Sequence, residues 1–135
     1  MRAVLIHDRH SRSIRFSKML AKIPDMEIVM QSHSPGDAQE LCAEYTPDLL
    51  IMNTFSKETS SLENIAHIKQ EFPDIKVFIM IGTMDDGIAL KAKEAGADIV
   101  ARKNLSQDEL AQLIRYSQKH YRVFPKTCPD SQEPP

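Results

Sequence analysis

Four polar side chains each stand one or two residues after a short apolar run. They are Asp8, Asn53, Thr83 and Lys103. Carboxylate oxygens are the ligands that Mg²⁺ prefers, and an ammonium group binds small anions. If the apolar runs are neighbouring strands of one parallel sheet, the side chains beyond their carboxyl ends share a single crevice. The spacing therefore predicts a binding crevice, provided that the chain forms such a sheet.

The apolar runs have the length and continuity of buried strands. Each is four or five residues long, and they cover residues 3–6, 26–30, 49–52, 77–81 and 98–101. They are apolar at consecutive rather than alternate positions, which is typical of strands covered on both faces. The pattern predicts five strands of a parallel sheet.

Amphipathic stretches separate these runs and predict five helices. The residues on their apolar faces are Phe16, Met19, Leu20 and Ile23; Ala38, Leu41, Cys42 and Tyr45; Leu62, Ile65, Ile68 and Phe72; Ile88, Ala89, Ala92 and Ala95; and Leu110, Leu113, Ile114 and Ser117. A capping box, Ser106 with Glu109, opens the last helix. Pro-Asp pairs at 24–25, 47–48 and 73–74 each precede a strand, because proline ends the helix behind it.

The alternation of strand and helix repeats five times, which predicts an α/β fold. We expect a flavodoxin-like (βα)5 three-layer sandwich with a parallel sheet in the order 2-1-3-4-5. The first, third and fourth strands are then neighbours, so their carboxyl ends meet. The pattern stops near Tyr121, and residues 125–135 hold four of the eight prolines. We expect a domain over residues 1–121 and a Pro-rich tail or linker over 122–135.

Composition narrows the function classes. The 135 residues carry 17 basic and 19 acidic side chains, a formal net charge of −2, so a protein that coats nucleic acid is not expected. No apolar run approaches the ~20 residues of a membrane helix, and the N-terminus is not a signal peptide. Cys42 and Cys128 make neither a disulfide framework nor a zinc motif. We expect a cytoplasmic protein.

Several segments together resemble a response-regulator receiver domain, CheY-like and of the NarL/FixJ type. They are MRAVLIHD at 1–8, PDLLIMN at 47–53, FPDIKVF at 72–78, EAGAD at 94–98, Lys103 ahead of Ser106 and Glu109, and YRVFP at 121–125. The resemblance covers about residues 1–125. It implies an aspartate after the third strand that accepts a phosphoryl group, and two acidic residues after the first strand that hold Mg²⁺.

This chain departs from the family at the reacting positions. Asn53 stands at the phosphoacceptor position, and a neutral carboxamide cannot replace the attacking carboxylate. His7 and Asp8 stand where the family has two acids, so one metal-binding carboxylate is missing. We therefore expect no cofactor and weak or absent Mg²⁺ binding. The family's lysine is kept as Lys103.

The family's switch positions differ as well. The hydroxyl residue after the fourth strand aligns with Ile81, although Thr83 lies nearby, and the aromatic position of the fifth strand is Val100. Together these departures predict a pseudo-receiver that is not an enzyme and signals without aspartyl phosphorylation. The resemblance implies a protein partner or a homodimer. Two surfaces are expected for this contact. One is formed by the fourth helix, the fifth strand and the last helix, and the other by the first and last helices. We expect this domain to contact neither nucleic acid nor a membrane.

Other interpretations remain open. Asn53 is either a strand-ending residue or a stand-in that mimics one signalling state. Lys103 and Asp8 pair either as a structural ion pair or as a lock on one state. His7 could begin a transition-metal site with Asp8, or act as a pH sensor. The alternative functions are a sensor of a small anion or metabolite, with Lys103 as anchor, and the receiver half of a NarL/FixJ-type DNA-binding regulator.

Overall fold

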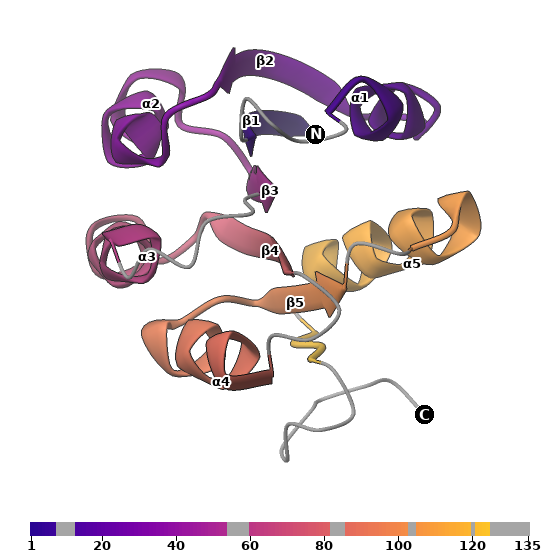
Figure 1. Ribbon diagram of the computed structural model, residues 1–135. Coiled ribbons are helices and arrows are strands. Elements are labelled where there is room, and N and C mark those ends of the chain that lie inside the picture. Colours follow the sequence, from indigo (N-terminus) through magenta and orange to yellow (C-terminus); the bar gives the residue numbers. More distant parts are fainter. Residues whose placement is uncertain (8–12, 54–59, 82–85, 103–104, 120, 125–135) are drawn as a thin grey trace.

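The computed structural model describes residues 1–7, 13–53, 60–81, 86–102, 105–119 and 121–124. Strands and helices alternate along these residues as the sequence predicts (Figure 1). The strands are β1 (Arg2–His7), β2 (Glu27–Ser32), β3 (Leu49–Asn53), β4 (Lys76–Ile81) and β5 (Ile99–Arg102). The helices are α1 (Ser13–Ala21), α2 (Ala38–Tyr45), α3 (Ser60–Glu71), α4 (Asp86–Ala95) and α5 (Gln107–Gln118), with a short 3-10 turn, η1 (Pro35–Asp37), before α2.

The five strands form one parallel sheet in the order β2-β1-β3-β4-β5. Helices α2, α3 and α4 cover one face of the sheet, and α1 and α5 cover the other (Figure 1). The predicted flavodoxin-like three-layer fold and its strand order are therefore confirmed. The order changes direction between β1 and β3, which is where ligands bind in such sheets.

Two apolar clusters fill the spaces between the layers. Alternate residues of each central strand divide between them: Val4 and Leu50 pack under α2, α3 and α4, whereas Leu5 and Ile51 pack under α1 and α5. Because both faces are buried, the strands read as continuous apolar runs in the sequence.

Local signals end and begin the elements as expected. The Ser106 side chain accepts from the N–H of Glu109 at 3.1 Å, and the Glu109 carboxylate accepts from the N–H of Ser106 at 3.4 Å. This is the predicted capping box of α5. Asp48 of the second Pro-Asp pair accepts the N–H of Arg2 at 2.8 Å and so fixes the start of β1 against that of β3.

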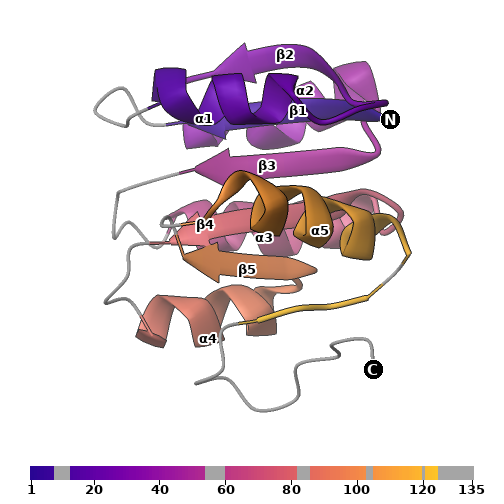
Figure 2. The same ribbon diagram turned by 90° about the vertical axis from the view of Figure 1, so that its right-hand side faces the viewer.

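The packed chain runs beyond residue 121, where the sequence analysis ends the domain. Residues 122–124, here called the C-terminal strap, lie along the outer edge of β5 (Figure 2). Val123 and Phe124 are 8% and 3% exposed. Burial of two large apolar side chains holds this segment to the domain, although it has no helical period.

The helices of the described ranges are short relative to the thickness of a membrane. None of them has the length and apolar character needed to cross a membrane.

Candidate functional site

Side chains at the carboxyl edge of the sheet form a short row on the α1/α5 face. His7, Asn53, Met80 and Ala101 are partners in register across β1, β3, β4 and β5. His7 and Asn53 are 6% and 5% exposed. The fold thus brings together two of the predicted site residues, at the change of strand order.

Two buried atoms in this row lack hydrogen-bond partners among the described residues. They are Nδ1 of His7 and Oδ1 of Asn53. An unsatisfied buried polar group costs about 1–3 kcal/mol, and most buried polar groups in native proteins are hydrogen-bonded. The pair marks this end of β1 and β3 as a polar site inside an apolar layer.

His33, which follows β2, contacts His7 directly. The ring centroids are 4.3 Å apart in an edge-to-face arrangement, and the Nδ1 of His33 lies 3.3 Å from the carbonyl oxygen of His7. Burial lowers the pKa of His7, the charge of His33 lowers it further, and a hydrogen bond with the Gln31 side chain opposes both. His7 is therefore neutral at pH 7. No sequence signal singled out His33, because it lies 26 residues from its partner.

The described part of this site does not fit Mg²⁺. Magnesium prefers anionic oxygen ligands in an octahedral arrangement, whereas His7 offers a neutral imidazole and Asn53 a neutral carboxamide. Within the described ranges, no three His, Cys, Asp or Glu side chains gather as a metal site would need.

Two of the predicted switch positions, Ile81 and Val100, lie on the opposite face of the sheet. Ile81 ends β4 and Val100 lies in β5; both are almost fully buried in the cluster under α2, α3 and α4. Their side chains are aliphatic and pack as core residues. The remaining predicted site residues, Asp8, Thr83 and Lys103, lie outside the described residues.

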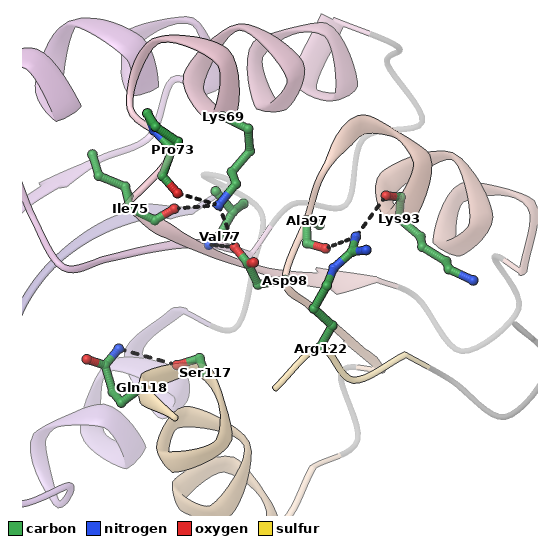
Figure 3. Close-up of polar contacts among 10 residues, drawn as sticks. All are labelled: Lys69, Pro73, Ile75, Val77, Lys93, Ala97, Asp98, Ser117, Gln118 and Arg122. Atoms are coloured by element: carbon green, nitrogen blue, oxygen red, sulfur yellow. Dashed lines mark hydrogen bonds and ion pairs between the residues drawn. The ribbon is translucent and has the colours of Figure 1, made fainter. Parts of the chain in front are cut away.

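A second polar cluster lies at the opposite, amino edge of the sheet (Figure 3). The ammonium of Lys69 in α3 donates to Asp98 Oδ2 at 3.1 Å and to the carbonyls of Pro73 and Ile75 at 3.2 and 3.0 Å. Asp98 also accepts the N–H of Val77 at 2.9 Å. The EAGAD segment thus has a structural role in this chain: its last residue joins α3, β4 and β5.

Comparisons with known proteins point to one kind of protein. No protein-family model matches the chain. VraR response regulators from Staphylococcus saprophyticus and Staphylococcus aureus are each 26% identical over 124 residues, which is 92% of this chain. The chain spans 59% of the length of these relatives.

Solved structures agree with this similarity. A LuxR-family response regulator from an Aurantimonas species superposes with a TM-score of 0.79 at 26% identity, over 90% of this chain and 86% of that one. A DNA-binding response regulator of the LuxR family from Staphylococcus aureus gives 0.67 at 25%, over 85% and 97%. The apo receiver domain of RcsB from Salmonella enterica, at 18% identity, shares the fold with a TM-score of 0.75, over 93% of each chain. The comparisons support a response-regulator receiver domain of the NarL/LuxR type.

Proposed function

We propose that this domain is a receiver that transmits its signal through protein contacts and without aspartyl phosphorylation. The observation that carries the proposal is Asn53 at the end of β3, 5% exposed and in register with His7. A carboxamide is a poor nucleophile, because its nitrogen lone pair is delocalised and its oxygen bears no full charge. The domain would then act as a binding module rather than as an enzyme.

The neighbouring residues support the same conclusion. Phosphoryl transfer to a carboxylate needs a divalent cation to offset the charge of the phosphoryl oxygens. His7 is neutral and buried, so it adds no negative charge to hold that cation. Ile81 and Val100 pack in the core on the other face. They supply neither the hydroxyl nor the aromatic ring that the resemblance implies for a phosphorylated state. We expect weak or absent Mg²⁺ binding.

The partner is proposed to be a protein or a second copy of the chain. Two surfaces are candidates, α1 with α5 and α4 with β5 and α5. On the first, Gln107 of α5 donates to the carbonyl of Met19 in α1 at 2.9 Å, so the two helices form one continuous surface. Since the curated relatives are longer than this chain, a DNA-binding half is a further proposed recipient of the signal. The described domain is not proposed to contact DNA itself.

The decisive experiment offers the protein a phosphoryl donor. Wild type, Asn53→Asp and the control Gln70→Glu are incubated with acetyl phosphate and Mg²⁺, and intact mass spectrometry measures phosphoryl uptake. Gln70→Glu adds the same charge at an exposed site on α3. We expect no uptake by wild type or by either variant, and an oligomeric state that acetyl phosphate does not change. Uptake by wild type, or its restoration by Asn53→Asp alone, would show that the phosphorylation site still works.

The buried polar pair favours a second candidate, a small-molecule sensor. Nδ1 of His7 and Oδ1 of Asn53 have no partners within the described ranges. A carboxamide oxygen accepts hydrogen bonds, so this part of the site fits a ligand with hydroxyl or amino donors. An anion would instead depend on Lys103. Thermal-shift screening of both ligand classes tests this candidate, because a ligand of the native state raises the melting temperature. A ligand that raises the melting temperature of wild type supports the sensor function only if it does not raise that of Asn53→Leu.

A further inference from the structure

The C-terminal strap closes the outer edge of β5. Val123 forms a parallel bridge with Ile99. The N–H of Val123 donates to the carbonyl of Asp98 at 3.0 Å, and the carbonyl of Val123 accepts the N–H of Val100 at 2.9 Å. Without the strap, these groups of residues 98 and 100 would lie unpaired on a sheet edge. Such an edge is a template for another strand.

Phe124 anchors the strap under α4. Its ring is buried in the same cluster as Val100 and Ala92. The ammonium of Lys93 lies 5.4 Å and the guanidinium of Arg122 lies 5.0 Å from the ring centroid. Val123 pairs with residue 99, so Phe124 stands beside residue 100. The strap thus places an aromatic ring next to a position where β5 itself has only valine.

Arg122 ties the strap to the end of α4. Its guanidinium donates to the carbonyl of Lys93 at 3.2 Å and to that of Ala97 at 3.0 Å (Figure 3). The carbonyl of Lys93 also accepts the N–H of Gly96 at 3.1 Å, and Ala97 lies beyond the end of α4 at Ala95, so these bonds fasten the strap to the turn that follows the helix. Docking of three residues therefore joins the exit of α5, the end of α4 and the edge of β5.

The surface beneath and beside the strap fits a second copy of the chain. Residues 98 and 100 offer one acceptor and one donor, a set that can pair with itself about a two-fold axis. Leu90 of α4 lies three residues before Lys93, on the same side of the helix. It is 42% exposed, and no other large apolar side chain in the described part of the chain is as exposed. Leu90 would add an apolar contact next to the paired edges.

We propose that the C-terminal strap is a releasable clasp. Docked, it closes the β5 edge and keeps the domain from pairing there. Released, it exposes that edge and the Leu90 side of α4 to a second copy. Although Val123 and Phe124 are buried, a short segment on a sheet edge can open locally at a lower free energy than the whole domain. The clasp would thus supply a conformational switch remote from Asn53, and it does not depend on how the carboxyl-edge site is used.

Amide hydrogen exchange by NMR measures release directly. The N–H groups of Val100 and Val123 report the docked strap, and the N–H of Phe78 in β4 reports the core. In wild type we expect the strap amides to exchange faster than Phe78. In the double variant Arg122→Ala/Phe124→Ala we expect Val100 exchange to rise at least about tenfold while Phe78 stays unchanged. Arg115→Ala, on the exposed side of α5, is the control for a lost charge.

Light scattering after gel filtration then tests pairing over a range of concentrations. The release variant should form dimers, and its Val100 N–H should regain protection as the dimer forms. Val123→Pro, which removes the N–H bonded to Asp98 and fixes the backbone of the strap, should also shift toward dimers. It serves as the release variant if the double variant does not fold. The proposal is overturned if strap and core amides exchange together in wild type. It is also overturned if the released proteins stay monomeric, or dimerise with Val100 unprotected.

Discussion

Gly96 lies against the aliphatic stem of Lys69. A Cβ atom on Gly96 would stand 3.1 Å from Cγ and 3.3 Å from Cβ of that lysine, and the backbone of Gly96 has φ +111°. Close approach and backbone conformation both call for glycine here. The stem that Gly96 contacts carries the ammonium that pairs with Asp98. The glycine and the aspartate of the EAGAD segment therefore position the same lysine.

Replacing this glycine should be costly. Gly96→Ala must relieve both the strained φ and the contact with Lys69, so we expect a loss of about 1–2 kcal/mol in the free energy of unfolding. Gly87 in α4 is the matched control, because a Cβ there meets nothing within 4 Å. Gly87→Ala should stabilise the protein by about 0.4–1 kcal/mol. Urea unfolding of both variants measures the difference, and equal effects would contradict this explanation.

Removing Lys69 should destabilise the domain more than removing the charge of Asp98. Lys69→Met deletes three donated hydrogen bonds and leaves Asp98, whose side chain is 10% exposed, without its cation. We expect a loss of about 3 kcal/mol. Asp98→Asn keeps an acceptor for the N–H of Val77 and should cost about half as much.

Lys91→Met, on the exposed side of α4, should change stability by less than about 0.5 kcal/mol. The double variant Lys69→Met/Asp98→Asn completes a mutant cycle measured by urea unfolding. If the two single losses simply add in the double variant, the ion pair contributes no coupling.

Stability should fall as the pH drops below 6.5, in part because of His7. The pKa of His7 is lowered in the folded protein from its ordinary value of 6.5, so the unfolded chain binds the proton first. Stability rises with pH wherever the unfolded state holds more protons. The contribution of His7 is therefore complete above about pH 6.5 and is lost toward its lowered pKa. In His7→Gln we expect a flatter stability profile between pH 7 and 5.

His67→Gln is the control for that experiment, because His67 is exposed on α3. Urea unfolding at several pH values should show that the free energy of unfolding changes with pH in this variant as it does in wild type. If the free energy of unfolding of His7→Gln changes as steeply with pH as that of wild type, the pH dependence belongs to other groups.

Asn53 should stabilise the folded protein less than an apolar side chain of similar volume would. Its buried Oδ1 lacks a partner in the described part of the protein, and leucine has a similar volume without a polar atom. We expect Asn53→Leu to unfold at an equal or higher urea concentration than wild type. The free energy of unfolding should rise by at most about 1–3 kcal/mol. Asn53→Asp should unfold at a lower urea concentration at pH 7, because it puts a charge at a position that is only 5% exposed. Destabilisation by leucine would show that the carboxamide is satisfied in solution.

The elements and their order were accessible from the sequence. The apolar run at 49–52 predicts the strand Leu49–Asn53 to within one residue. The prediction works because a strand buried on both faces must be apolar throughout. The predicted capping residue Ser106 begins α5 as expected, because a cap acts on its own helix within three residues. These signals are local, so no knowledge of the tertiary structure was needed to interpret them. The place of Asn53 at the carboxyl edge followed from the same alternation.

Only the tertiary structure decided which distant side chains meet. His33 contacts His7 across two strands, and Lys69 reaches Asp98 across 29 residues. Neither pair has a spacing that a helix or a strand would impose. Val123 and Phe124 form too short an apolar segment to show any period, so the sequence alone assigned them to the tail. Their burial depends on the open edge of β5 and on the end of α4, surfaces that exist only once the sheet has formed.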